Sequence, residues 1–90
     1  MRKKKTNDIE IVYKRYAFMY YDKAVLWIEL ADGVDEYNVT IYDCFDNVVK
    51  ILTCYKYNKV YIIDNLVKNS MYYCLYLGNK VKDIHIFKKN

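Results

Sequence analysis

Residues 63–77 have the sequence IDNLVKNSMYYCLYL, in which a short polar segment separates two apolar runs. Leu66 and Tyr72 bracket the polar segment, and from Tyr72 onward the run is apolar and aromatic without interruption. An uninterrupted apolar run bounded by turn residues is typical of a β-strand that is covered on both faces. The stretch therefore predicts a strand end, a corner and a central strand in succession.

The spacing of this corner, Ile63-x-x-Leu66-x-Lys68-x-Ser70-x-Tyr72, resembles the fibronectin type III pattern Ile-x-x-Leu-x-Pro-x-Thr-x-Tyr. Lys68 stands where that family usually has proline, and Ser70 stands where it usually has threonine. In Greek-key sandwiches a tyrosine at this place sends its hydroxyl back to the backbone a few residues upstream. The resemblance implies that the Tyr72 hydroxyl bonds to the backbone between Leu66 and Ser70.

Upstream of the corner, residues 24–30 (AVLWIEL) form an apolar run that contains the single tryptophan. The run predicts a strand with Trp27 as a core anchor, and a tryptophan at this place resembles the second strand of fibronectin type III domains. Residues 37–42 alternate, so Tyr37, Val39 and Ile41 are expected to face the core. With Leu66 and Tyr72, these landmarks extend the resemblance over residues 24–87.

The resemblance implies an all-β fold, a seven-stranded Greek-key antiparallel β-sandwich of the fibronectin type III-like kind. Residues 9–21 suit an edge strand because Lys14 and Arg15 lie in its middle, and basic side chains protect strand edges. Residues 48–54, 60–63 and 81–87 supply the remaining strands. Ninety residues fit one domain, with residues 1–8 as a basic flexible arm and 9–90 as a single β-sandwich domain.

Composition supports a strand-rich protein, with twelve tyrosines, no proline and two glycines. The abundance of Lys, Asn, Ile and Tyr also indicates an AT-rich coding genome, as in low-GC bacteria, their phages and some large DNA viruses. The net charge of +4 is unevenly distributed: residues 24–49 carry six acidic and no basic side chains, whereas residues 50–90 carry eight basic and two acidic ones. Such blocks can steer a charged partner.

Three cysteines, Cys44, Cys54 and Cys74, and one histidine form no ligand or disulfide pattern. The sequence therefore predicts free thiols in a reducing, cytoplasmic compartment, with no cofactor and no metal. His85 alternates with apolar neighbours and is expected at the surface. No nucleophile and base pair stands out, so we expect no enzyme. No run is as long as the ~18 apolar residues of a membrane span.

The sequence favours a small stand-alone protein-binding module, an adaptor or inhibitor, that acts through an aromatic outer sheet face. In the strand that begins at Tyr72, the positions out of phase with the core remain apolar, and Tyr is an efficient interface residue. The predicted face belongs to a sheet of residues 37–42, 72–77 and 81–87, and a second copy of the chain is an alternative partner. The expected binding residues are Tyr42, Tyr73, Leu75 and Leu77, with Lys50 and Lys82 at the rim.

Nucleic-acid binding by basic and aromatic side chains is the alternative function, and a small oligonucleotide-binding β-barrel would be the fold that fits it. The candidate residues are Arg2 to Lys5, Lys56, Tyr57, Lys59, Lys80, Lys82, Lys88 and Lys89. The sequence pI of about 8.9 and the acidic block at residues 24–49 weigh against it.

Overall fold

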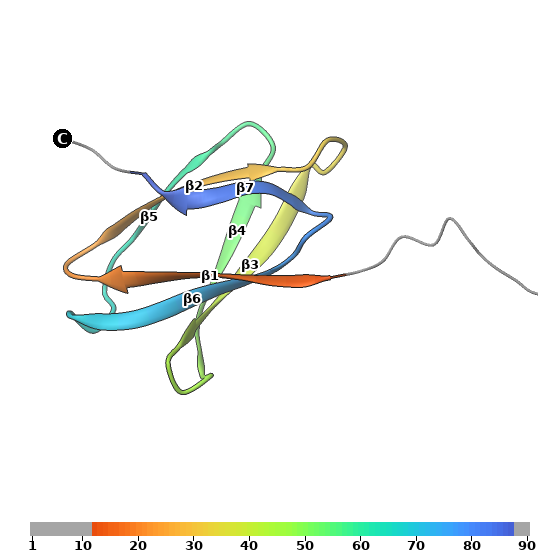
Figure 1. Ribbon diagram of the computed structural model, residues 1–90. Helices are drawn as coiled ribbons and strands as arrows, with labels where there is room; N and C mark the ends of the chain where they lie inside the picture. Colours follow the sequence, from red (N-terminus) through yellow and green to blue (C-terminus); the bar gives the residue numbers. More distant parts are fainter. Residues whose placement is uncertain (1–11, 88–90) are drawn as a thin grey trace, which may run out of the picture.

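The structure, a computed structural model, describes residues 12–87, and this part of the chain is all-β without a helix. Its strands form two antiparallel sheets that pack face to face as a sandwich (Figure 1). The strands are β1 (Tyr13–Tyr20), β2 (Ala24–Leu30), β3 (Glu36–Asp43), β4 (Val48–Tyr55), β5 (Val60–Ile63), β6 (Ser70–Leu77) and β7 (Val81–Ile86). The predicted all-β sandwich is thereby confirmed.

The larger sheet has the order β1-β6-β3-β4, and the smaller sheet has the order β5-β2-β7. β6 is a central strand and β1 is an edge strand, as their sequences predicted, and β4 forms the other edge of the larger sheet. The predicted basic arm at residues 1–8, and the first residues of the strand predicted at 9–21, lie outside the described residues. The Greek-key and fibronectin type III assignments stay predictions.

The predicted sheet of residues 37–42, 72–77 and 81–87 is wrong in one strand. β7 pairs with β2 in the smaller sheet, and β1 occupies the place beside β6, as Figure 1 shows. β1 pairs with β6 from Tyr13 opposite Leu77 to Tyr20 opposite Ser70, along the whole of β6, and β3 pairs on the other side, so β6 has no free edge left for β7. β7 instead crosses to the other sheet, where Ala31 donates its N–H to the Lys80 carbonyl at 2.9 Å.

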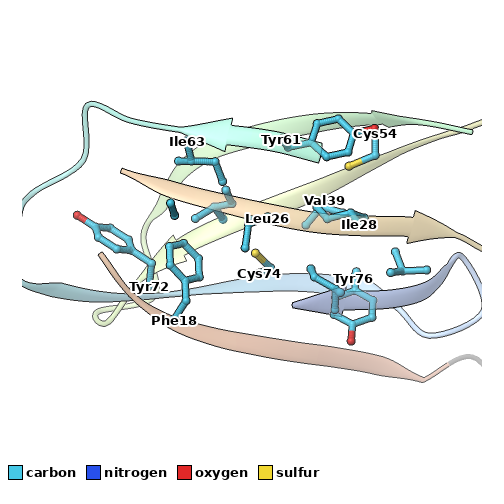
Figure 2. Close-up of a cluster of buried hydrophobic side chains, with 14 of the residues drawn as sticks. Phe18, Leu26, Ile28, Val39, Cys54, Tyr61, Ile63, Tyr72, Cys74 and Tyr76 are labelled. Carbon is cyan, nitrogen blue, oxygen red and sulfur yellow. The ribbon is translucent and has the colours of Figure 1, made fainter. Parts of the chain in front are cut away.

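The core lies between the two sheets (Figure 2), and its residues alternate most regularly along β2 and β6. In β6, Tyr72, Cys74 and Tyr76 are buried whereas the residues between them are half-exposed. In β3, Val39 and Ile41 are fully buried, as predicted, and Tyr37 packs against the core from a half-buried position. Alternation is the consequence of the pleat, which points successive side chains to opposite faces.

Trp27 is not a core residue, so that prediction is wrong. The core side of β2 consists of Ala24, Leu26, Ile28 and Leu30, and Trp27 is half-buried on the opposite side. There its ring stacks on His85 at 6.1 Å between centroids and lies 6.3 Å from Phe87. An apolar run does not show which alternate set faces inward, and in β2 the aliphatic set does.

Several tyrosines attach strands to neighbouring backbone through their hydroxyl groups. The Tyr72 hydroxyl accepts the N–H of Val67 at 2.9 Å, which confirms the predicted corner. Tyr16, Tyr20, Tyr37 and Tyr61 make further bonds of this kind, to Ile86, Asp22, Leu77 and Tyr55, respectively. Burying a phenol is favourable when its hydroxyl is hydrogen-bonded. In this chain, which has no proline, these tyrosine hydroxyls link neighbouring segments of the backbone.

Candidate protein-binding surface

The side of the larger sheet that faces away from the core is a broad surface, which we name the outer sheet face. Its residues are those out of phase with the buried set on each strand. They are Tyr13, Arg15, Ala17 and Met19 of β1, Met71, Tyr73, Leu75 and Leu77 of β6, Glu36, Asn38, Thr40 and Tyr42 of β3, and Val48, Ile51, Thr53 and Tyr55 of β4.

Cross-strand pairing arranges these side chains in rows. Residues opposite each other in neighbouring strands have their side chains on the same face and in contact. One row runs Arg15, Leu75, Thr40, Ile51. The next runs Ala17, Tyr73, Tyr42, Val48. The rows give a continuous surface across all four strands, in which the ionisable side chains besides the tyrosines are Arg15 and, at the beginning of β3, Glu36.

A stack of flat groups occupies the middle of the outer sheet face. The rings of Tyr42 and Tyr73 lie 5.2 Å apart and are almost parallel, at 10°. The guanidinium of Arg15 lies 5.2 Å from the centre of the Tyr73 ring. Aromatic and cation–π contacts of this kind each contribute about 0.5 to 1.5 kcal/mol. The stack fixes three large side chains in place before any partner arrives.

Asp46 fixes the far end of Tyr73. The Tyr73 hydroxyl donates to the Asp46 Oδ1 at 2.6 Å, and this bond is the main reason why the pKa of Tyr73 is raised. The hydroxyl therefore stays protonated and acts as a donor near neutral pH. Because Arg15 and Asp46 carry opposite charges and both contact Tyr73, the centre of the outer sheet face has no net charge.

Asp46 reaches Tyr73 because of the turn between β3 and β4. Asp43 accepts the N–H groups of Phe45 and Asn47 at 2.9 Å each, and these bonds, that from Asn47 first, lower the pKa of the Asp43 carboxyl. Asp46 has a φ of 68°, a left-handed conformation that Asp tolerates better than most residues. The local sequence DCFDN thus builds the turn that presents Asp46 to the neighbouring strand.

The outer sheet face is unusually apolar for a surface that meets water. The exposed fractions are 40% for Met19, 42% for Met71 and 60% for Ile51. An antiparallel sheet with one solvated face normally alternates apolar and polar residues. Contiguous exposed apolar groups mark interaction sites more often than isolated ones do.

The structure brings four of the predicted binding residues together and separates two. Tyr42, Tyr73, Leu75 and Leu77 lie half-buried on the outer sheet face, as their phase predicted. Lys50 pairs with the core residue Ile41 and so points to the opposite side of the sheet.

Lys82 lies in β7 of the smaller sheet, with its Nζ 3.9 Å from a carboxylate oxygen of Glu29. The prediction that Lys50 and Lys82 form the rim of this surface is therefore wrong.

Sequence reasoning missed the contribution of β1, which supplies Arg15, Met19 and Tyr13 in place of β7. A signal existed in the alternation of residues 13–20, where Tyr16, Phe18 and Tyr20 form the inward set. That pattern shows which side chains of β1 face the core, but it does not show which strand β1 pairs with. Strand pairing between residues fifty or more positions apart in the sequence is a property of the folded chain.

Other chemistry is sparse in residues 12–87. No group of three or more His, Cys, Asp and Glu side chains gathers there as a metal site. The three thiols are free, with Cys44 exposed, and burial raises the pKa of Cys54 and of Cys74 to about 12. A polar pocket beside Tyr20 contains the ion pair of Asp22 and Lys68 at 3.3 Å, so its charges are already compensated.

In the described part of the chain no helix has the length and apolarity to cross a membrane. Comparisons with protein-family models, with curated proteins and with solved structures found no match, so the outer sheet face is a candidate on its geometry alone.

Proposed function

We propose that this protein is a binding module, not an enzyme, and that it binds another protein chain through the outer sheet face. The observation that carries the proposal is the continuous and largely apolar and aromatic surface over four strands, with the stack of Tyr42, Tyr73 and Arg15 in its middle. Tyrosine and arginine are enriched at the energetic centres of protein interfaces. A partner with an uncharged, apolar surface fits this face best.

Fixed side chains add to this support. Rigid groups lose little conformational freedom on binding, so more of the contact energy appears as affinity. Tyr73 is held on one side by Arg15 and at its hydroxyl by Asp46. Around this fixed centre, Met19 and Met71 are flexible and exposed, and methionine adapts to irregular partner surfaces.

Charge placement favours a protein partner over nucleic acid. Two of the lysines considered for phosphate contacts lie beside carboxylates: Lys56 is 3.9 Å from Asp35, and Lys82 is 3.9 Å from Glu29. The outer sheet face offers Arg15 as its one cation. Nucleic-acid binding requires several unpaired cations along a path and weakens steeply with salt. Partner binding by this face should therefore depend only weakly on salt concentration.

Photo-crosslinking tests the proposal. A photoreactive phenylalanine analogue at Met71 should yield discrete crosslinked species in an extract of the source cells. The same analogue at Ile62 is the matched control, because Ile62 is also an exposed aliphatic strand residue, at 60%, but lies on the smaller sheet. Adding Leu75→Glu to the Met71 probe should remove the crosslinks, since it places a charge in the centre of the face.

Folding of each variant is checked by circular dichroism and thermal melting. Met19→Glu, at a more exposed position, serves as the second disrupting variant if Leu75→Glu is unfolded. Equal crosslinking from Met71 and Ile62, or crosslinks that survive both glutamate variants in folded protein, would show that the partner binds elsewhere.

A further inference from the structure

β4 has one free edge, since within residues 12–87 its only strand partner is β3. In an antiparallel strand both backbone groups of a residue point to the same side, and successive residues alternate. Lys56 donates its N–H to the Asp35 carbonyl, at the point where β4 leaves β3. Counting back from Lys56, the even-numbered residues of β4 bond to β3 and the odd-numbered residues point to the free edge.

Between the register shift and the end of β4, the odd-numbered residues are Ile51, Thr53 and Tyr55. The free edge is already closed at Tyr55, because its N–H donates to the hydroxyl of Tyr61 at 2.7 Å and its carbonyl accepts the N–H of Asn58. The backbone groups of Ile51 and Thr53 therefore form the open part of the edge.

A bulge closes the other end. Ile41 pairs with Lys50 but Tyr42 pairs with Val48, so Val49 is an extra residue that interrupts the regular edge. The bulge at Val49 and the closed end at Tyr55 are separated from Leu52 by the same number of residues along β4, on opposite sides. The open groups of Ile51 and Thr53 also flank Leu52 symmetrically. The free edge is thus symmetric about one residue.

We propose that two copies of this chain join at the open part of this edge, antiparallel, with the twofold axis at Leu52. In this register Ile51 of each copy exchanges N–H and C=O bonds with Thr53 of the other, and the two Leu52 residues form the non-bonded pair at the axis. The bulge of one copy meets the closed end of the other, so neither obstructs the pairing. The result is one continuous sheet with closed twofold symmetry.

Charge also selects a second copy in this register. β4 carries Lys50 and no carboxylate, and Lys50 would lie opposite Cys54 of the second copy, away from the other Lys50. Pairing of β4 with β1, the other edge of the larger sheet, would place Lys50 beside a strand that carries Lys14 and Arg15. It would also leave a β4 edge at one end and a β1 edge at the other, so that further copies could add without closure. Like charges on sheet edges oppose such pairing.

Amide hydrogen exchange at several protein concentrations tests the proposed register. Exchange at Ile51 and Thr53 should be fast in dilute protein and should slow as concentration rises, because only the second copy bonds these groups. Exchange at Leu52, whose N–H bonds to β3, should stay slow throughout. Rates at Ile51 and Thr53 that do not change with concentration, or that are slow at every concentration, would overturn the proposal.

A disulfide trap gives an independent measurement. Facing Cα atoms of a non-bonded antiparallel pair are about 4.5 Å apart, close enough for a disulfide. In a Cys44→Ser background oxidised with diamide, Leu52→Cys should form a covalent dimer, whereas Ile51→Cys, which faces Thr53, should not. Equal dimer from both variants, or none from a folded Leu52→Cys, would contradict the register.

The edge dimer can be tested separately from the proposed function, because it uses the backbone groups of Ile51 and Thr53, whereas partner binding uses the side chains of the outer sheet face. Leu75→Glu should leave the Leu52→Cys dimer unchanged. Leu52→Lys, at a position that points away from the outer sheet face, would place two like charges opposite each other at the twofold axis. It should abolish concentration-dependent exchange while leaving crosslinking from Met71 intact. Loss of both signals in a folded Leu52→Lys variant would show that the two surfaces are not separate.

Discussion

The Tyr72 hydroxyl ties the corner before β6 to the strand by accepting the Val67 N–H. Tyr72→Phe keeps the buried ring and removes only the acceptor, so the Val67 N–H loses its partner. We expect the free energy of unfolding to fall by about 1 kcal/mol without a change of fold, as measured by urea denaturation.

Tyr57→Phe is the control for this variant, since Tyr57 is 89% exposed. It should leave the urea midpoint unchanged. A Tyr72→Phe midpoint equal to that of the control would mean that the corner bond contributes nothing.

Trp27 and Leu26 are neighbours in β2 with opposite environments. Leu26 is fully buried, and Leu26→Ala should cost about 2 to 5 kcal/mol because it leaves a cavity. Trp27→Ala removes a half-buried ring that stacks on His85, so we expect a smaller cost of about 1 to 2 kcal/mol. Thermal melts of both variants measure these costs. A larger loss of stability in Trp27→Ala than in Leu26→Ala would contradict the placement of Trp27 outside the core.

At the scale of elements, the β3–β4 turn depends on one carboxylate. Hydrogen bonds from Asn47 and Phe45 lower the pKa of Asp43, so the folded turn holds this proton less tightly than the unfolded chain does. The stabilisation is present above the ordinary value of 3.8 and is lost as the pH falls below it. The protection of the Phe45 and Asn47 amides against hydrogen exchange, relative to their intrinsic rates, should fall in this acid range.

Asp43→Ala is the matched variant for this turn. In this variant the Phe45 and Asn47 amides should already exchange fast at neutral pH. As the pH falls, their rates should change no more than those of amides elsewhere in the protein that serve as references. A turn that keeps the parent's protection in Asp43→Ala would show that the carboxylate is dispensable.

Element positions followed from the sequence because their patterns are local. The predicted strands at 24–30 and 60–63 coincide with β2 and β5, and the strand predicted from Tyr72 lies within β6. The alternation of β3 also gave the inward set Val39 and Ile41 correctly. The sequence of β2 does not alternate between apolar and polar residues, although the burial of its side chains does. The sequence therefore does not show which face is inward, and for this reason the prediction for Trp27 is wrong.

For the whole molecule, two buried thiols couple stability to alkaline pH. Burial raises the pKa of Cys54 and Cys74 from 9.0 to about 12, so the folded state holds both protons more tightly than the unfolded state. The free energy of unfolding should be independent of these groups below pH 9 and should fall above it. For Cys74 the expected fall is about 1.4 kcal/mol per pH unit.

Urea denaturation across this alkaline range measures the effect. Cys74→Ala will be less stable at neutral pH because it leaves a cavity, but its stability should fall less steeply above pH 9 than that of the parent. Cys44→Ser is the control, since Cys44 is exposed, and it should keep the parent's slope. If the free energy of unfolding fell equally steeply with pH in all three proteins, the buried thiols would not be the cause of the alkaline destabilisation.

The sequence by itself determined the all-β class, most strand positions, the Tyr72 corner and the phase of Tyr73, Leu75 and Leu77, since each depends on neighbouring residues along one strand. Only the tertiary structure decided that β1 and not β7 lies beside β6, and hence that Arg15 stacks on Tyr73 while Lys50 and Lys82 lie apart from them. The physical reason is that backbone edges of different strands are chemically alike. Their pairing is therefore chosen by length, register and core packing over the whole domain, which no local pattern encodes.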